Sequence, residues 1–477
     1  MASPTMPVPT APKNLPPVDH NVLLVVIDDV GAEWWSFYGI GDRFTTDPQF
    51  TYPRTPTITR LAQFGLTFLE AYANPVCGPT RACIQTGQHA FRTGFGENLR
   101  DPGSMGTIGH RLSDALNWQP RAIHQARPGV YDTGIVGKWH IADGYSTVVP
   151  PGILTPPDAN LDHAVAVGYD YSSIHMPNNG DTYAWHRIVN GVVMPAAGYS
   201  APPYTNSTWA PSVHAADAIQ WINSRTKPWF LHLAFNAPHS PFTVPPFETL
   251  SAQTINELTT AGLTPGFTVP TTATYAQVQR VWRASMESVD HALGLVLASM
   301  PATELAKTMV IVYGDNGTVI NALPPGFLHS KRDVYRGGTQ VPLVINGPLV
   351  VNPGRQPTAL AHAVDIHATV LDIVGGRAPA KIKDMDGISL MPAILDQPGK
   401  RRRVLTEVTR PWGETNPALL TLVQRAFFDG RWRYVNRGGP DELYDNHADF
   451  LEAVNVAAAN PAITAQMKRE VEELVGG

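Results

Sequence analysis

The chain has 477 residues, enough for one large domain and a smaller one. Its formal net charge is −5 and it contains no long run of basic residues, which argues against nucleic-acid binding. No apolar run approaches the roughly 20 residues that a membrane-spanning helix needs. Residues 1–20 are rich in proline and hold no apolar core of signal-peptide length, so we expect a flexible arm on a cytoplasmic protein that binds neither nucleic acid nor a membrane.

The first predicted strand covers residues 21–27, a continuous apolar run typical of a parallel strand that is buried on both faces. It ends in Asp28 and Asp29, at the end of a strand where open α/β sheets bind ligands. Two adjacent carboxylates repel each other by up to roughly 4 kcal/mol at 4 Å, and a divalent cation would reverse the sign of this interaction. The alternative is a helix cap followed by a turn residue.

A helix is predicted over residues 55–65, capped by Thr55, and a short strand over residues 68–72. The segment Cys77-Gly78-Pro79-Thr80-Arg81 follows. Proline suits the first turn of a helix, so we expect a helix to begin beside Cys77. Helix amides and the Arg81 guanidinium both favour an anion here, and a thiol would be activated. Taken alone, the same residues also fit a buried structural cysteine.

Three later strands deliver polar residues to their carboxyl ends. Strand 133–138 ends at Lys138 and leads to His140, and strand 227–235 leads to a turn that displays His239. Strand 308–313 ends in Gly314-Asp315-Asn316. Asp315 and Asn316 form an oxygen-only set with the carboxylate pair after the first strand, which favours calcium or magnesium over zinc. The predicted metal ligands are therefore Asp28, Asp29, Asp315 and Asn316.

The remaining segments complete the predicted architecture. Residues 145–208 are rich in Pro, Gly, Tyr and Asn, and we expect them to line a substrate cleft. Helices are predicted over 212–225 and 273–300. After residue 400 the pattern changes to short strands and a last helix. We therefore expect an α/β protein, with a large mostly parallel sheet flanked by helices in a domain over 21–399, and a small antiparallel sheet with a helix over 400–477.

These segments together resemble the type I, formylglycine-dependent sulfatases of the alkaline phosphatase superfamily. The Cys77-x-Pro79-x-Arg81 segment with its later Thr86-Gly87 pair resembles the family signature. Gly-Lys-Trp-His at 137–140, Pro-His-x-Pro-Phe at 238–242 and Lys-x-x-x-Tyr-x-Gly-Gly at 331–338 follow in the family's order. Arg336 stands where the family usually has glutamate, a departure that puts local packing and specificity in question. The resemblance extends over nearly the whole chain.

The resemblance implies an arylsulfatase-type sulfuric ester hydrolase that releases sulfate from a small sulfate ester. A formylglycine-generating enzyme would convert Cys77 to an aldehyde, whose hydrate attacks sulfur. The hydrate would share Ca²⁺ or Mg²⁺ with the predicted ligands, so that residue 77 also counts as a metal ligand. His239 and Lys331 would assist departure of the alcohol, and His140 would take the proton that lets sulfate leave. The implied catalytic residues are Cys77, Arg81, Lys138, His140, His239 and Lys331.

Two alternatives remain open at this point. Some members of the same superfamily that carry the formylglycine signature are phosphonate monoester hydrolases or phosphodiesterases. The chain could also be a non-catalytic homologue that binds an anion or a metal and keeps Cys77 as a thiol.

Overall fold

The computed structural model describes residues 19–98, 111–142, 160–175, 182–183, 185, 187–194, 209–375, 385–398, 403–410 and 421–476. Most of the arm expected at residues 1–20 lies outside these ranges, as do large parts of the predicted cleft wall at 145–208. Within the described residues, no helix combines the length and the apolar character needed to cross a membrane.

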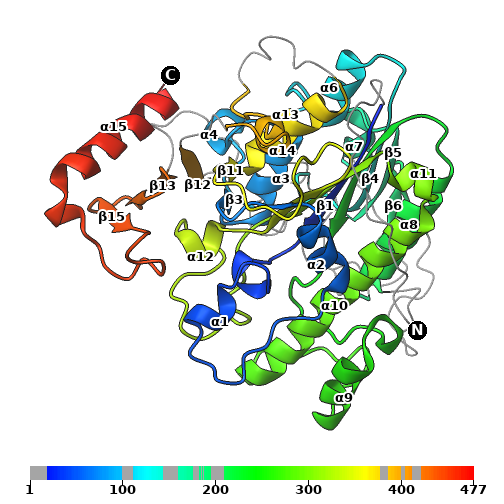
Figure 1. Cartoon of the computed structure of the whole chain (residues 1–477), viewed down its shortest axis with the longest axis horizontal. Helices are drawn as coiled ribbons and strands as arrows, with labels where there is room; N and C mark the ends of the chain where they lie inside the picture. Colours follow the sequence, from blue (N-terminus) through cyan, green and yellow to red (C-terminus); the bar gives the residue numbers. More distant parts are fainter. Residues whose placement is uncertain are drawn as a thin grey trace.

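A nine-stranded sheet forms the centre of the chain before residue 400 (Figure 1). Its strands are β1 (Asn21–Ile27), β2 (Leu66–Thr67), β4 (Asp132–Lys138), β5 (Tyr171–His175), β6 (Ile188–Val189), β7 (Val192–Val193), β8 (Trp229–Phe235), β9 (Thr308–Gly314) and β10 (Leu343–Asn346). They lie in the order β2-β10-β9-β1-β8-β4-β5-β6-β7. The five strands from β9 to β5 pair in parallel, and those outside them pair antiparallel.

Helices cover both faces of this sheet (Figure 1). One face carries α3 (Cys77–Thr86), α6 (Gln119–Ala126) and α13 (Ala363–Ile373), and the other carries α2 (Pro56–Gln63), α8 (Ala210–Asn223) and α10 (Tyr275–Ser299). The shorter elements are α1 (Gly41–Phe44), α4 (Ala90–Thr93), α7 (His163–Ala166), α9 (Ala252–Thr260), α11 (Ala302–Leu305), α12 (Arg336–Thr339), α14 (Met391–Ile394) and the paired strands β3 (Ala71–Tyr72) and β11 (Ala361–His362).

Strand β1 shows why the central strands have continuous apolar sequences. Its residues Val22, Leu24 and Val26 pack into the core on one face of the sheet, and Leu23, Val25 and Ile27 pack on the other. Burying each such side chain contributes about 1.5–3 kcal/mol, so a charged residue inside this strand would be strongly destabilising. The polar residues are therefore confined to the strand ends, where they form the site described below.

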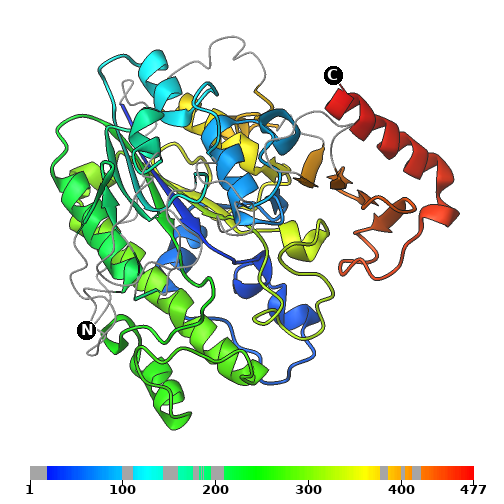
Figure 2. The same ribbon diagram turned by 180° about the vertical axis from the view of Figure 1, so that it is seen from behind.

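A second, four-stranded antiparallel sheet lies beyond α12, with the last helix packed on it (Figures 1 and 2). Its elements are β12 (Val404–Arg410), β13 (Leu422–Phe428), β14 (Trp432–Asn436), β15 (Glu442–Asp445) and α15 (Pro461–Gly476). Met467 and Val471 of α15 pack on Leu405, Phe427 and Leu443 of the sheet. The expected fold class, a large mostly parallel sheet with a smaller C-terminal antiparallel sheet and helix, is confirmed.

Arg336 joins the two sheets and does not point toward the strand ends that carry the polar residues. Its guanidinium lies 4.4 Å from the ring centroid of Phe450 and 3.5 Å from Glu70, and its backbone N–H donates to Glu452 at 2.7 Å. Glu452 also pairs with the buried Arg433 at 2.6 Å. The residue at the family's usual glutamate position therefore holds the C-terminal sheet against the loop that follows Lys331.

Two local expectations were wrong. The Thr55 side chain does not cap α2; the backbone N–H groups of Thr57 and Ile58 donate instead to the Asp290 carboxylate, at 2.9 and 2.8 Å. Residues 68–72 do not form one strand, because β2 ends at Thr67 and β3 begins at Ala71.

Candidate active site

The carboxyl ends of β1, β9, β4 and β8 bring the predicted polar residues together. Asp28 and Asp29 follow β1 directly, Asp315 and Asn316 follow β9, Lys138 ends β4, and His239 lies in the turn after β8. This turn has two cis prolyl bonds, at Pro238 and Pro241. All five residues from β1, β9 and β4 are buried.

Cys77 occupies the first position of α3, as the Pro79 argument predicted. Its Sγ lies 3.3 Å from Oδ1 of Asp28 and 3.6 Å from Oδ1 of Asp29. The N–H of the next residue, Gly78, donates to Asn98 Oδ1 at 2.8 Å, a contact that no pattern in the sequence indicated. A side chain at Gly78 would collide with Phe95 at 2.8 Å, so the tight approach at the start of α3 requires glycine.

The structure corrects the expectation that a thiol at residue 77 is activated. Burial raises the pKa of Cys77 well above its usual range, and the charges of Asp28 and Asp315 raise it further, outweighing Lys138 and Lys331. The S–H group therefore stays protonated and is a weak nucleophile in this position.

Three cations offset the three carboxylates. Lys138 Nζ lies 2.5 Å from Asp28 Oδ2, and Lys331 Nζ lies 2.6 Å from Asp29 Oδ1. Arg81 donates to Asp315 Oδ2 through Nη2 at 2.7 Å and Nε at 3.1 Å, and through Nη1 to the carbonyl of Lys138 at 2.9 Å. Each buried charge is therefore paired, which is the condition under which charges are tolerated in a protein interior.

The carboxyl groups of Asp29 and Asp315 differ in acidity. Burial alone would raise the pKa of Asp29, but the ammonium charges of Lys331 and Lys138 outweigh it and lower the pKa well below the usual value. Burial and the charge of Asp28 raise the pKa of Asp315 to about 6, although Arg81 opposes the rise. Asp29 is therefore ionised at neutral pH, whereas the pKa of Asp315 lies closer to neutral pH.

Both predicted histidines are electrically neutral; His140 is buried and His239 is partly exposed. Burial and the charges of Lys138 and Arg81 lower the pKa of His140 well below its usual value. Burial lowers the pKa of His239 to about 3 even though Asp29, 3.6 Å from its Nε2, raises it. His140 has a φ of 53°, and neither of its ring nitrogens has a hydrogen-bond partner among the described residues. Such strain and lack of partners are typical of residues that serve a ligand.

The donor set fits a hard cation. Asp28, Asp29, Cys77 and His239 each place a ligand-type atom within 4.8 Å of the others. Asn316 donates to Asp29 Oδ1 at 2.9 Å, while its own Oδ1 is buried without a partner in the described part of the chain. An unpartnered amide oxygen beside two carboxylates suits Ca²⁺ or Mg²⁺. Both oxygens of Asp315 accept from protein groups, from Arg81 and from the Asp29 N–H, whereas in Asp28 and Asp29 the ammonium groups of Lys138 and Lys331 each occupy one oxygen.

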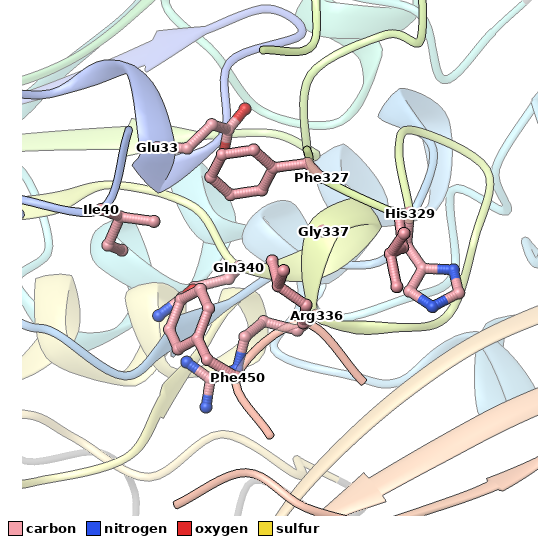
Figure 3. Close-up of a pocket in the computed structure, with 10 residues that line it drawn as sticks. Glu33, Ile40, Phe327, His329, Arg336, Gly337, Gln340 and Phe450 are labelled. Carbon is pink, nitrogen blue, oxygen red and sulfur yellow. The ribbon is translucent and has the colours of Figure 1, made fainter. Parts of the chain in front are cut away.

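A separate small pocket opens beside α12, between the two sheets (Figure 3). Glu33, Ile40, Phe327, His329, Arg336 and Phe450 are among the residues that line it. None of the predicted site residues contributes to its lining. Burial raises the pKa of Glu33 to about 7, and its Oε1 has no partner among the described residues.

The sequence interpretation missed two buried histidines next to the site. His175 ends β5 and is the ladder partner of Lys138, and His214 lies in α8 over the same strand end. Neither belongs to a recognisable motif. The register between β4 and β5 brings His175 beside Lys138, and the position of α8 brings His214 onto His175. Neither can be read from the sequence.

Comparison with known proteins identifies the family. The family model described as Sulfatase matches residues 20–376. The chain therefore belongs to the sulfatase family, within the alkaline phosphatase superfamily. It is 24% identical over 398 residues to an N-acetylgalactosamine-6-sulfatase of Canis lupus familiaris, covering 80% of this chain and 66% of that protein. It is also 24% identical over 503 residues to a sulfatase of Formosa agariphila, covering 93% and 85% of the two chains.

Solved structures share the fold. A structure of Ps i-CgsB in complex with k-i-k-neocarrahexaose superposes with a TM-score of 0.71 at 20% identity, covering 96% of this chain and 93% of that one. A structure in complex with its substrate D-glucosamine-2-N,6-O-disulfate gives 0.67 at 20% identity, with 96% and 98% covered. The phosphonate monoester hydrolase of Agrobacterium radiobacter gives 0.65 at 21% identity, with 96% and 95% covered.

Proposed function

We propose that this protein hydrolyses sulfate monoesters to an alcohol and inorganic sulfate, with formylglycine made from Cys77 as the nucleophile. The observation that carries the proposal is the convergence of Asp28, Asp29 and Lys331 on Cys77, the first residue of α3, with Lys138 paired to Asp28. Family membership supports the same reaction.

The raised pKa of Cys77 supports a modified residue over a cysteine nucleophile. Burial and two carboxylates within 3.6 Å of Sγ oppose a thiolate, which makes the unmodified side chain a poor source of the attacking anion. A formylglycine hydrate supplies two hydroxyl groups, one to attack sulfur and a second whose deprotonation lets sulfate leave. A hard cation held by Asp28, Asp29 and Asn316 would supply the positive charge that such a hydroxyl and a sulfate oxygen require.

The chain's own residues supply charge, orientation and proton transfer. Arg81, Lys138 and Lys331 place positive charge around the position of a bound sulfate group. His239, 3.6 Å from Asp29, is assigned to the leaving-group side with Lys331. Its Nδ1–H donates to the Ser240 carbonyl, so its neutral ring must first take up a proton at Nε2 before it can donate one to the leaving oxygen. His140 has two unpartnered ring nitrogens and is assigned the proton transfer that releases sulfate.

The organic part of the substrate is a separate question. The tyrosine and tryptophan content of residues 145–208 suggests an aryl sulfate, whereas relatives named for N-acetylgalactosamine 6-sulfate favour a sugar sulfate. An activated aryl sulfate serves as a first assay substrate in either case, because its phenolate leaves readily.

A phosphonate monoester hydrolase is the second candidate, because the Agrobacterium radiobacter enzyme has the same fold. The test compares turnover of 4-nitrophenyl sulfate and 4-nitrophenyl phenylphosphonate by one preparation whose residue 77 has been identified by peptide mass. We expect higher kcat/KM for the sulfate ester. Higher kcat/KM for the phosphonate would favour the second candidate, and no turnover of either would favour a binding protein.

A further inference from the structure

The chain segments that follow β1 and β9 stay joined beyond the point where the ladder of the two strands stops. The parallel pairing ends at the last residue of each strand. After it, two side chains that follow β9 accept backbone N–H groups that follow β1. Asp315 Oδ1 accepts the N–H of Asp29 at 3.0 Å, and Thr318 Oγ1 accepts the N–H of Gly31 at 3.0 Å. Asp315 is a predicted metal ligand, whereas Thr318 belongs to no motif in the sequence.

Thr318 also holds the backbone of Lys331. Its carbonyl accepts the Lys331 N–H at 2.8 Å. The Lys331 ammonium pairs with Asp29 at 2.6 Å and lies 3.2 Å from Sγ of Cys77. Thr318 therefore binds the backbone on both sides of this ion pair, through its hydroxyl two residues after Asp29 and through its carbonyl at Lys331.

Both sides of this connection contain a residue in the left-handed region. Asp29 has a φ of 60°, and Arg332, directly after Lys331, has a φ of 83°. A non-glycine residue keeps such a conformation only where the surrounding contacts enforce it. The N–H groups of Asp29 and Arg332 donate to Asp315 and to the Pro75 carbonyl, at 3.0 and 2.8 Å. The next bond along the chain, beside each of these two residues, ends on Thr318.

The contact between Thr318 and Gly31 is enclosed. Thr318 is 0% exposed and Gly31 is buried. The carboxyl group of Glu33 lies over Gly31, since a Cβ at residue 31 would be 2.1 Å from Glu33 Oε2. Glu33 in turn lines the pocket beside α12 (Figure 3). The Glu33 carboxyl therefore separates the Gly31 N–H from the pocket, and this N–H is left unpaired if the Thr318 hydroxyl is removed.

We propose that Thr318 is a positioning residue for the hydrolysis, which holds the Asp29 carboxylate and the Lys331 ammonium in their orientation toward residue 77. This inference rests on the proposed sulfatase function, because it needs a reaction at residue 77. The Thr318 hydroxyl is fully buried and bonded to the Gly31 N–H, so it acts through Asp29 and Lys331.

The test compares side chains at position 318 that differ by one hydroxyl group. Thr318→Val keeps the shape of threonine without its hydroxyl, and Thr318→Ala lacks the hydroxyl that Thr318→Ser keeps. We expect kcat for 4-nitrophenyl sulfate to fall by about tenfold or more from wild type to Thr318→Val, and from Thr318→Ser to Thr318→Ala, because small displacements in a site slow a reaction strongly. Thr318→Ser should keep kcat within about threefold of wild type. Each rate is divided by the fraction of formylglycine at residue 77, determined by peptide mass.

Two further readouts separate positioning from a merely structural role. KM should change by less than about threefold in Thr318→Val, because Arg81 and Lys138 still face the sulfate position. Lys331 is assigned to the leaving-group side, so the loss of kcat in Thr318→Val should be larger for an alkyl sulfate than for 4-nitrophenyl sulfate. A preparation that only contains less folded enzyme loses the same factor on both substrates.

Thr369→Val is the matched control. Thr369 of α13 is also fully buried, and its hydroxyl accepts the N–H of Leu390 at 2.9 Å. This variant should unfold at a lower temperature than wild type and keep kcat within about threefold. Thermal unfolding verifies that each variant is folded at the assay temperature, and if Thr318→Val is not, the comparison of Thr318→Ser with Thr318→Ala decides.

Equal kcat in folded Thr318→Ser and Thr318→Ala would overturn the inference, as would an equal loss on the alkyl and the aryl sulfate. A rise in KM with an unchanged kcat would also overturn it, since Thr318 would then affect substrate binding alone. If wild-type enzyme with complete conversion of residue 77 hydrolyses no sulfate ester, the proposed function itself fails, and this inference fails with it.

Discussion

The amino group of Lys331 lies 3.2 Å from Sγ of Cys77, although 254 positions separate the two residues in the sequence. The same amino group lies 2.6 Å from Asp29. Burial alone would lower the pKa of Lys331, but the carboxylate charges of Asp29, Asp28 and Asp315 outweigh it and raise the pKa above the usual value. A permanent cation therefore faces the side chain at residue 77.

Replacing Cys77 by serine or by alanine should abolish multiple turnover and leave the fold intact. A serine ester of sulfate has no second hydroxyl through which sulfate can leave, and alanine has no nucleophile. Steady-state release of inorganic sulfate and thermal unfolding measure the two parts of this expectation. Cys83→Ser, at the other buried cysteine, is the matched control and should remain active. Near wild-type steady-state activity in Cys77→Ser would refute the role of residue 77.

Asp29→Ala should lower activity and stability together. It removes the partner of the buried Lys331 ammonium, and breaking a buried ion pair costs about 3–5 kcal/mol. Denaturant unfolding should show this loss, whereas Glu473→Ala on the exposed face of α15 should not.

Removal of the predicted cation provides an independent check on this part of the site. Treatment with a chelator should lower activity, and added Ca²⁺ or Mg²⁺ should restore it. If the chelator changes neither activity nor thermal stability, the assignment of a metal to Asp28, Asp29 and Asn316 is wrong.

The two histidines should have separable effects. His239→Ala should impair substrates with poor leaving groups, such as alkyl sulfates, more than activated aryl sulfates, whose phenolates leave without a proton. His140→Ala should slow a step that is common to all substrates. It should therefore release about one equivalent of alcohol per enzyme and then stall.

Single-turnover kinetics with one activated and one poor leaving group tests these assignments. If both residues only hydrogen-bond the bound sulfate, each substitution should raise KM equally for the two substrates. If KM rises in this way and His140→Ala shows no burst, the roles assigned to His239 and His140 are refuted. The sulfatase function would still stand.

Glu33→Gln should stabilise the protein in a pH-dependent way. The pKa of Glu33 rises from 4.5 to about 7 because its carboxyl group is buried. The folded state therefore favours the protonated form, and the stability that this group contributes is complete below pH 4.5 and lost as the pH rises toward 7. The total loss is about 3 kcal/mol.

Glutamine cannot ionise, so the gain in unfolding free energy from Glu33→Gln should grow from near zero at about pH 4.5 to about 3 kcal/mol at about pH 8. Urea unfolding across this range measures it. Exposed Glu248→Gln should show no such trend. A gain that does not vary with pH would mean that Glu33 ionises normally in the folded protein.

Local sequence signals predicted much of the fold. The apolar run at 21–27 corresponds to β1 residue for residue, and the run at 308–313 corresponds to β9 apart from its last glycine. Such strands are recognisable because burial on both faces requires a continuous apolar sequence. The Asp28-Asp29 and Asp315-Asn316 pairs stand directly after these two strands, so the sequence also indicated that the candidate site lies at the strand ends.

What the sequence could not provide depends on contacts between distant residues. Asp290 caps α2 from 233 positions away, and no helix-start signal near Thr55 indicates this. The raised pKa of Cys77 follows from burial and from the carboxylates of Asp28 and Asp315 that the fold brings to it, which reversed the expectation of an activated thiol. The stacking of His175 on His214 depends on the register of β5 and on the position of α8 over it.

The central claim is that residue 77, as formylglycine, hydrolyses sulfate esters. The most direct measurement is the rate of sulfate release from 4-nitrophenyl sulfate in preparations that contain different fractions of formylglycine at residue 77, as determined by peptide mass. We predict a rate proportional to that fraction, with no turnover when residue 77 is entirely cysteine. Full activity with unmodified Cys77, or no activity at complete conversion, would contradict the account.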